Sequence, residues 1–267
     1  MTEIPKHLQQ YVDYITKSGG SPHVSWFIDD FDPIGDRVLD DLMKLKLINI
    51  KNGIITLKEI KKMSESKILF FDTETTNLPQ FKKPNHDPSQ PKILQLGAIL
   101  ATDEGEVVDE YSTLVQIGDT PINPYALAAH GISAKRANEE GIPPTEMFLR
   151  FHELSQSCDA LACHNFNFDI KLIQITSAQI QGTFTDPDTS ALLMSDIEEL
   201  PYYCTMASTI SYCNLPFPSG RKGKKFPKLE ELYRILFEEE FEGAHDAMAD
   251  VRATMRCYFE LKERGIM

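Results

Sequence analysis

The sequence predicts an α/β domain in which helices flank a mixed central sheet of about five strands. Three observations support this prediction. An uninterrupted apolar run at 67–71 is typical of a strand buried on both faces. Two β-favouring segments on either side of a turn at 102–105 predict a hairpin beside it. Amphipathic helices fill most of the chain that follows, and such helices cover the faces of a sheet.

The elements of this domain, residues 67–267, are expected in a simple order. The central strand covers 67–76 and leads into a long irregular loop, 77–92, of a length that is often functional. In the segment 143–157, apolar residues recur at helical spacing, as Met147, Phe148, Phe151 and Leu154 show. We expect further strands at 93–101, 106–117 and 161–163, and helices at 121–130, 143–157, 205–213, 228–237 and 247–262, with one more ending near 180.

Residues 1–66 have the pattern of a separate small unit. Two amphipathic helices precede two short strands around Asn52-Gly53, which is the strongest short-range signal for a hairpin. This order resembles a winged-helix domain, whose last helix can lie in the DNA major groove. The corresponding helix, Gly35–Lys46, mixes acidic and basic residues, so a basic groove-reading face is not evident. DNA binding and a packing or protein-binding role both stay open, and we slightly favour the second.

Composition excludes several classes of protein. With 267 residues, 42% hydrophobic and 25% charged, the chain matches an ordinary globular protein. No apolar run approaches the roughly 18 residues of a membrane span, and the N-terminus lacks the pattern of a signal peptide. The five cysteines are odd in number and form no CxxC pair. We therefore expect reduced thiols in a cytoplasmic compartment, without disulfides or a zinc site.

The net charge of −13 argues against a protein that coats duplex nucleic acid. Residues 67–267 contain 18 basic and 30 acidic residues, so nearly all of the excess lies there. An acidic domain that handles phosphates needs metal ions or a local basic strip to offset the repulsion. The segment 218–228, with five basic residues and no acid, is a candidate for such a strip.

Two carboxylates stand at the end of the central strand, in Phe71-Asp72-Thr73-Glu74. Alternate residues of a strand point to the same side, so Asp72 and Glu74 leave one face of the sheet together. The carboxyl end of such a strand is where open α/β sheets keep their sites. Two like charges this close repel each other unless a cation or a proton lies between them. Taken alone, however, the pair is more simply explained as a solvated strand end.

Two further motifs place acids near histidines. In His164-Asn-Phe-Asn-Phe-Asp169 the aspartate falls at the start of a helix. In His245-Asp-Ala-Met-Ala-Asp250 we expect the histidine on a loop and Asp250 in the first turns of the last helix. For the motif at 164–169 alone, an acid that stabilises a helix N-terminus through the macrodipole is the favoured explanation. For the motif at 245–250 alone, a surface histidine beside helix N-terminal acids is a plausible one.

Together, and in this order, the three motifs resemble those of the DEDDh exonucleases, the DnaQ-like and RNase T-like superfamily. The resemblance covers about 67–262 and includes Ala129-His-Gly-Ile132, Cys204-Thr-Met206 and Lys228-Leu-Glu-Glu-Leu232. It implies the RNase H-like exonuclease fold. The chain departs from the family at Asn77, where glycine is common, and in the length of the loop that follows.

The resemblance also implies five catalytic residues, Asp72, Glu74, Asp169, His245 and Asp250. The four carboxylates would hold two Mg²⁺ or Mn²⁺ ions, because these hard cations prefer carboxylate oxygens. His245 would take the proton of the attacking water near neutral pH. Position 246, where the Tyr-type branch of the superfamily has its tyrosine, is an aspartate, so His245 fills this role.

Substrate contacts are expected beside these motifs and on the basic strip. Leu78 would wedge against the terminal base, and Phe166 or Phe168 would stack on it, because aromatic stacking tolerates any sequence. For Phe168, packing in the core is favoured at least as much. His130 would touch the terminal nucleotide or only shape a turn. For the strip, a track for the strand backbone and a solvated loop are equally favoured. The expected contact residues are Thr75, Leu78, His130, Asn165, Phe166, Arg221, Lys222, Lys224 and Lys225.

We therefore predict a metal-dependent 3′→5′ exonuclease that releases nucleoside monophosphates from single-stranded or frayed 3′ ends, with DNA preferred. An exoribonuclease that trims RNA 3′ ends is the alternative, because discrimination rests on the 2′-hydroxyl. A different class, a nucleic-acid- or protein-binding module directed by residues 1–66, is a third hypothesis. The presence of all four acids and the histidine argues against a purely scaffolding role.

Overall fold

The computed structural model describes residues 6–17, 24, 35–44, 48–51, 54–57, 66–186 and 188–267. The chain forms two compact units, Met1–Glu65 and Ser66–Met267. In the first unit, helices α1 (Lys6–Lys17) and α3 (Gly35–Lys44) pack on the antiparallel strands β1 (Ile48–Lys51) and β2 (Ile54–Leu57). This order of helices and hairpin is the expected one. The Asn52-Gly53 turn and most of 58–66 lie outside the described residues, so the winged-helix comparison stays a prediction.

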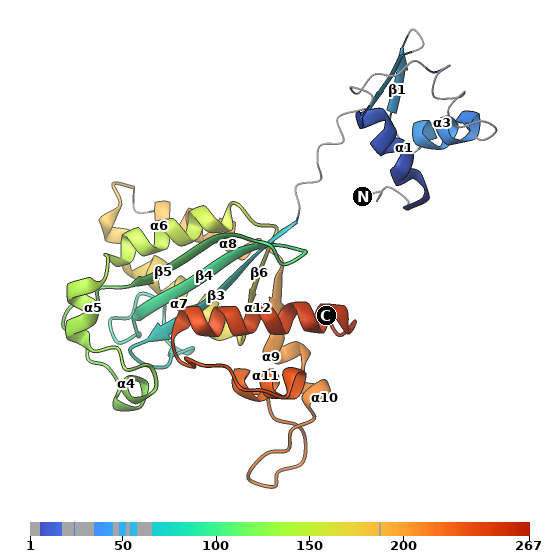
Figure 1. Cartoon of the computed structure of the whole chain (residues 1–267). Coiled ribbons are helices and arrows are strands. Elements are labelled where there is room, and N and C mark those ends of the chain that lie inside the picture. The colour runs from blue at the N-terminus through green and yellow to red at the C-terminus, as the bar shows by residue number, and fades with distance from the viewer. Residues whose placement is uncertain are drawn as a thin grey trace. The chain divides into compact units, whose positions relative to one another are not determined.

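A mixed five-stranded sheet forms the centre of the second unit (Figure 1). Its strand order is β5-β4-β3-β6-β7, with β3 antiparallel to β4 and parallel to β6. The central position of β3 explains why its apolar run is buried on both faces. The strands are β3 (Lys67–Thr75), β4 (Ile93–Thr102), β5 (Val107–Leu114), β6 (Ala160–Cys163) and β7 (Tyr202–Cys204).

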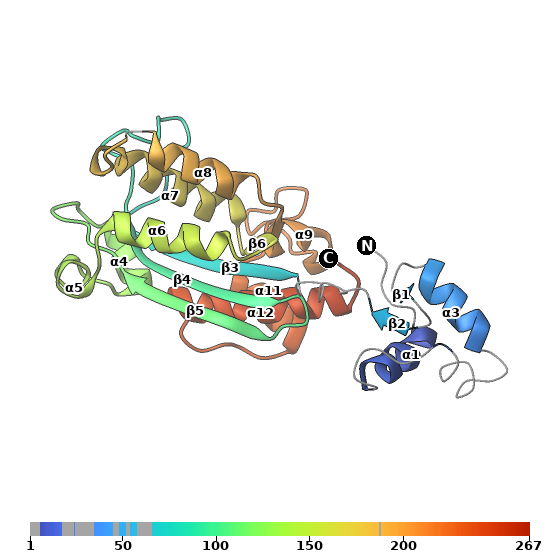
Figure 2. The same cartoon turned by 90° about the horizontal axis from the view of Figure 1, so that it is seen from above.

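Helices cover both faces of this sheet (Figure 2). On one face lie α6 (Pro144–Ser155), α7 (Phe166–Gln179) and α8 (Thr189–Glu198), and on the other lie α11 (Leu229–Phe237) and α12 (Ala247–Glu263). The shorter helices are α4 (Pro124–His130), α5 (Ala134–Glu140), η1 (Gln181–Thr183), α9 (Thr205–Ser208) and α10 (Ile210–Cys213).

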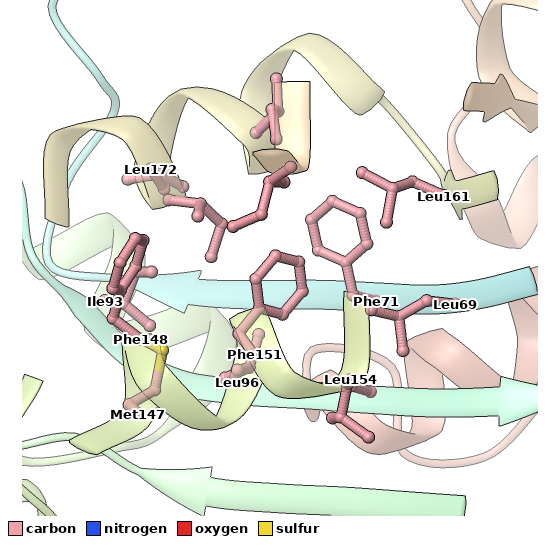
Figure 3. Close-up of a cluster of buried hydrophobic side chains, with 14 of the residues drawn as sticks. Leu69, Phe71, Ile93, Leu96, Met147, Phe148, Phe151, Leu154, Leu161 and Leu172 are labelled. Atoms are coloured by element: carbon pink, nitrogen blue, oxygen red, sulfur yellow. The ribbon is translucent and has the colours of Figure 1, made fainter. Parts of the chain in front are cut away.

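The period of two along β3 assigns its side chains to these two layers. Leu69 and Phe71 belong to the core under α6 and α7, where Phe71 meets Phe151 edge-on at 5.0 Å between ring centroids (Figure 3). Ile68 and Phe70 belong to the core under α12. By the same alternation, Asp72 and Glu74 face the α12 side. The strand pairing shifts only after Glu74, so the alternation holds for both acids.

The predicted fold class, a sheet of about five strands between helices, is confirmed. One predicted helix is wrong, because 205–213 forms two short helices that meet at Thr209. The buried hydroxyl of Thr209 donates to the carbonyl of Thr205 at 2.6 Å, and such back-bonding competes with the helix. The sequence patterns did not predict α5, α8 or β7. Among the described residues, no helix combines the length and apolar character that crossing a bilayer requires.

Candidate active site

The carboxyl end of β3 brings Asp72 and Glu74 to one wall of a cleft of about 570 Å³. Both side chains are partly buried. Neither accepts a hydrogen bond from any described residue, so each carboxylate still needs a partner for its charge. The cleft wall thus starts with two unpartnered acids fixed by the central strand.

A third acid reaches the same place from α7. Asp169 stands in the first turn of that helix and is only 2% exposed. Its Oδ1 accepts two hydrogen bonds from Thr73, from the backbone N–H at 3.1 Å and from the hydroxyl at 2.8 Å. Because Thr73 lies between the two strand acids, this contact fixes Asp169 beside them.

The fourth acid and the histidine come with the start of α12. Asp250 is in the first turn of this helix, and its Oδ2 accepts from the backbone N–H of His245 at 3.2 Å. His245 has a left-handed backbone (φ 70°) that few non-glycine residues adopt, and such strain is often found at functional sites. Ligand atoms of Glu74, His245 and Asp250 lie within 4.8 Å of one another.

Two residues of β4 hold the start of α12 against the sheet. Gly97 pairs with Asp72, and a Cβ at this glycine would lie 2.7 Å from the backbone carbon of Ala247. Gln95 pairs with Glu74; its side-chain nitrogen donates to Asp246 at 2.9 Å, and its oxygen accepts from the N–H of Ala247 at 3.2 Å. The residues opposite the two strand acids therefore position the helix that carries Asp250.

The electrostatics follow from this crowding. Burial, followed by the charges of Asp169 and Asp250, raises the pKa of Asp72 well above its usual range. Burial and the charge of Asp250 raise the pKa of Glu74 to about 8. Burial likewise raises the pKa of Asp169 to about 7, against the opposing hydrogen bonds from Thr73, and that of Asp250 to about 7. The protein alone does not neutralise this cluster.

The donor set fits a divalent cation. Carboxylate oxygens are the ligands that Mg²⁺ and Mn²⁺ prefer, and a cation removes the repulsion that raises these pKa values. The clustered ligand atoms of Glu74, His245 and Asp250 show that separate elements converge closely enough to share an ion.

His164, the first residue of the second motif, holds another wall of the cleft. Its Nε2 lies 3.0 Å from the carbonyl oxygen of Pro227, which can only accept, so this nitrogen carries the proton. Nδ1 then accepts from the hydroxyl of Thr205 at 2.9 Å. Burial lowers the pKa of His164 to about 4, which keeps the ring neutral. The side chain thus ties β6, α9 and the segment before α11 together.

The expected substrate residues have different positions. Leu78, 71% exposed, and Asn165 line the cleft. Phe166 does not, because it is buried and stacks on Tyr202 with 3.9 Å between ring centroids, whereas Phe168 faces the cleft.

Thr75 and His130 also lie outside the cleft lining. Thr75 is buried, and its hydroxyl donates to the carbonyl of Asn77 at 2.8 Å. His130 ends α4, and its Nδ1 accepts from the N–H of Ile132 at 2.9 Å. These two side chains are therefore used in shaping the turns beside the cleft.

The residues of the basic strip, 218–228, differ in their contacts: one lysine is paired with an acid, and the other expected contact residues are exposed. Lys225 is engaged by Glu231 at 2.5 Å, and this glutamate also accepts from the N–H of Lys228. Arg221 lies over the ring of Phe217 at 5.2 Å, and Lys224 donates to a backbone carbonyl at 3.4 Å. Arg221, Lys222 and Lys224 are exposed and lie outside the residues that line the cleft.

Several cleft residues were not singled out from the sequence. The carboxylate oxygen Oε1 of Glu230 lies 3.9 Å from Nε2 of His245. Phe226, 56% exposed, and Lys228 face the cleft because His164 holds the intervening Pro227. Lys228 and Glu230 lie in the segment Lys228-Leu-Glu-Glu-Leu232 of the resemblance, although no role was expected for either. No local pattern marks Phe226, since the contact that turns it inward joins residues far apart in the chain.

Comparisons with known proteins agree with this fold. Residues 69–258 match the family model described as Exonuclease, RNase_T. Similar solved structures include Escherichia coli Exonuclease I in complex with a dA16 oligonucleotide, at 22% identity and a TM-score of 0.54, and in complex with a dT13 oligonucleotide, at 22% and 0.57. A zinc-bound complex of that enzyme with single-stranded DNA matches at 23% identity and a TM-score of 0.56.

These likenesses cover 74–75% of this chain but only 41% of the other chains, so this chain spans less than half of their length. At such identity they concern the fold. The comparison with curated proteins gives no match. The family match at 69–258 extends over well more than half of the sequence and contains all three motifs. This chain therefore belongs to the RNase T-type exonuclease family.

Proposed function

We propose that this protein is a metal-dependent 3′→5′ exonuclease that releases nucleoside monophosphates from single-stranded or frayed 3′ ends, with DNA as its preferred substrate. One observation supports this most strongly. Three strand or helix ends and one loop bring five motif residues to a single cleft: Asp72, Glu74, Asp169, His245 and Asp250. The complexes of the structurally similar Exonuclease I with DNA oligonucleotides support the choice of single-stranded DNA.

In this proposal, the four carboxylates hold two Mg²⁺ or Mn²⁺ ions. When bound, these ions neutralise the acid cluster, stabilise charge on the phosphoryl oxygens and lower the pKa of an attacking water. The protein contributes fixed positions for the ligands, through the hydrogen bonds that Asp169 receives from Thr73 and that Asp250 receives from the His245 backbone.

His245 acts as the general base, accepting the water's proton on an imidazole nitrogen. Histidine is the side chain that most often performs such a proton transfer. Glu230, 3.9 Å from Nε2, favours the positively charged imidazole that results. The left-handed backbone at His245 turns its side chain toward the acids while its N–H is held by Asp250.

The cleft offers apolar and basic groups for a terminal nucleotide. Leu78, Phe168 and Phe226 line it, and bases stack on aromatic rings regardless of sequence. Lys228 adds a positive charge at the same wall. We retain Arg221, Lys222 and Lys224 as a backbone track on the loop that leads to Phe226, and exclude Lys225 because Glu231 engages it.

The test uses the purified full chain with Mg²⁺ and single-stranded DNA labelled at its 5′ end. We expect stepwise shortening of the labelled strand, and Asp72→Asn to slow it on the order of 10³-fold or more because one ligand charge is lost. Asp119→Asn is the matched control, since this exposed carboxylate is not part of the cleft lining. Immediate release of the labelled 5′ nucleotide would contradict the direction, and full activity in excess chelator would contradict the metal requirement.

A matched pair of DNA and RNA oligonucleotides tests the substrate class. We expect a higher kcat/KM on DNA at equal length and sequence. Faster hydrolysis of RNA would overturn the preference for DNA while leaving the nuclease proposal intact. Hydrolysis of neither strand by the metal-loaded protein would overturn the proposed function itself.

A further inference from the structure

The loop 77–92 is ordered around a buried glutamine. Gln90 is 2% exposed, and its side-chain nitrogen donates to the carbonyls of Gln80, Lys83 and Pro84 at 3.0–3.3 Å, while its oxygen accepts from the N–H of Gln80 at 3.0 Å. At the base of the loop, Thr76 and Lys92 form two hydrogen bonds of 2.9 Å. Because these bonds satisfy the backbone without a helix or strand, the loop has a defined shape.

This defined shape leaves an aromatic ring in solvent. Phe81 is 61% exposed, although buried rings elsewhere in the unit dominate its core. Nζ of Lys171 on α7 lies 5.9 Å from the centre of the Phe81 ring and donates to the Asn85 side chain at 2.6 Å. The loop is thereby docked on α7. An exposed ring on a fixed support offers a surface on which a flat partner can stack.

Two basic residues stand next to this ring in the chain, in a unit that is otherwise acidic. Lys82 and Lys83 follow Phe81 directly and are exposed. Lys83 donates to the hydroxyl of Ser89, and Lys82 forms no ion pair with any described residue. The single acid of the loop, Asp87, already accepts two hydrogen bonds from Ser89. The charge of Lys82 is therefore available for an anion on a bound partner, whereas the charge of Lys83 also acts on Asp87.

The ring lies within a short distance of the cleft along the chain. Leu78 lines the cleft, and Phe81 is three positions further on. Three residues span at most about 11 Å, which matches about three steps of 3.4 Å along a stacked strand. A strand whose 3′ end lies in the cleft is therefore long enough to reach Phe81 with its third or fourth nucleotide.

We propose that Phe81, Lys82 and Lys83 form a second subsite for single-stranded nucleic acid, in which a base stacks on Phe81 and adjacent phosphates meet the two ammonium groups. This inference rests on the proposed function, because it requires a strand whose 3′ end lies in the cleft. The subsite takes no part in the chemistry. It holds the substrate a few nucleotides from the bond that is cleaved.

The test compares hydrolysis of a DNA dinucleotide with that of a dodecanucleotide by the full chain. Phe81→Ala is expected to raise KM for the dodecanucleotide about 5- to 150-fold, the effect of losing one base–aromatic stack, with kcat unchanged. For the dinucleotide, which ends before the loop, kcat/KM stays within twofold of wild type. Phe81→Tyr keeps the ring and therefore keeps the wild-type KM.

Two matched controls separate the subsite from general surface effects. Leu192→Ala removes an apolar side chain on α8 that is 63% exposed. It is expected to leave the kinetic constants for both substrates unchanged. The double change Lys82→Gln and Lys83→Gln is expected to reduce the slope of log affinity against log salt by about 1.4, from about 0.7 for each phosphate of a single strand. Lys67→Gln, at the opposite end of β3, leaves that slope unchanged.

Binding is also measured directly, with the dodecanucleotide on an Asp72→Asn background that does not cleave it. An unchanged affinity and KM in Phe81→Ala would overturn the subsite, and so would an equal loss on both substrates, because the effect would then belong to the cleft. If the wild-type protein hydrolyses neither substrate, the proposed function fails. The binding comparison still shows whether Phe81 contacts a strand, so the two failures are distinguishable.

Discussion

At the scale of single residues, the acids of the cleft differ in how the protein holds them. Asp169 and Asp250 receive hydrogen bonds, from Thr73 and from the His245 backbone. Asp72 and Glu74 depend on the strand alone among the described residues. Hydrogen bonds to a carboxylate favour its charged form, so the two helix-borne acids are partly prepared for a cation. The two strand acids require the cation itself.

Thr73→Val tests whether these hydrogen bonds favour the charged form of Asp169, because valine keeps the shape of threonine and removes one donor to this acid. The pKa of Asp169 is about 7, and loss of a hydrogen bond that lowers it raises this pKa further. At pH 7 the proton then competes better with the cation. We expect the Mg²⁺ concentration for half-maximal activity to rise up to about tenfold at pH 7, the effect of about one pKa unit.

The same Mg²⁺ titration at pH 9 is the internal comparison. There the carboxyl is charged in both proteins, so the difference in Mg²⁺ requirement is expected to shrink. Thr113→Val, on β5, is the control, because its hydroxyl bonds Tyr111 and the carbonyl of Leu114 and is not part of the cleft lining. An equal shift at both pH values would mean that Thr73 acts through packing and not through the charge of Asp169.

At the scale of elements, the site depends on how closely α12 approaches β4. Gly97 stands opposite Asp72, and its missing side chain leaves room for the backbone of Ala247 and Met248. The neighbouring Gln95 completes this contact with two hydrogen bonds to the start of the helix. The distance between the acids of β3 and those of α12 is therefore set by a strand that carries no catalytic residue.

Gly97→Ala is expected to push the start of α12 away from the sheet. The added Cβ would meet backbone atoms at 2.7–2.9 Å, which no rotamer can relieve, and overpacking of this kind costs about 1–3 kcal/mol of stability. We expect a lower Tm in thermal unfolding and, in the folded protein, a loss of Mg²⁺ affinity. Gly182→Ala, with nothing within 4 Å of its Cβ, is the control. Wild-type Tm and Mg²⁺ affinity in Gly97→Ala would contradict this account of the helix position.

The elements also show what a sequence can predict. β3 was predictable because its apolar run is continuous, and α6 because its buried side chains recur at helical spacing. In contrast, α5 buries one residue, Ala137, and β7 has three residues at a sheet edge, so neither has a pattern long enough to recognise. These two elements form because the neighbouring structure stabilises them.

The same distinction applies to the site. The five motif residues could be proposed from the sequence because the three motifs, in their order along the chain, resemble those of the DEDDh exonucleases. Phe226 could not, because its place depends on the contact of His164 with Pro227. Phe166 and Phe168 differ by two positions, and only the observed first turn of α7 shows which ring enters the cleft. Local chemistry is visible in a sequence, whereas the packing that selects between neighbours is not.

At the scale of the whole molecule, the basic side chains of the acidic unit are concentrated in few places. Residues 67–267 carry 18 basic and 30 acidic side chains, and lysines gather at two loops, 77–92 and 218–228. One loop begins at the cleft with Leu78, and the other ends there with Phe226 and Lys228. A polyanion would be repelled by most of this unit, so its approach is restricted to the cleft and these loops.

The N-terminal unit has a core of its own, made by residues of both helices and the hairpin. On the exposed side of α3, Lys44 forms an ion pair with Asp41. An acidic neighbour of this kind offsets the charge of a lysine and so reduces the affinity of the helix for DNA phosphates. A packing or protein-binding role for residues 1–66 therefore remains the hypothesis that we slightly favour.

The acid cluster connects pH, divalent cations and global stability. In the metal-free fold the pKa of Glu74 is about 8 and those of Asp169 and Asp250 are about 7, whereas carboxyls of an unfolded chain titrate near 4. The folded state thus holds protons that the unfolded state releases, so stability falls as pH rises from about 4 to about 8. His164, with a pKa of about 4, stays neutral in the upper part of this range.

We therefore expect the Tm of the full chain in chelator to be lower at pH 8.5 than at pH 6.5, and Mg²⁺ to raise Tm more at pH 8.5, because cations then bind carboxylates without displacing protons. Scanning calorimetry at both pH values, with chelator or Mg²⁺, measures both effects.

Asp250→Asn removes one of the acids whose pKa is raised, so it should reduce the pH dependence and the Mg²⁺ effect together. Asp119→Asn should alter neither, since its carboxylate is exposed to solvent. A Tm in chelator that rises from pH 6.5 to 8.5 would mean that these acids are charged without a cation, and that the fold itself neutralises them.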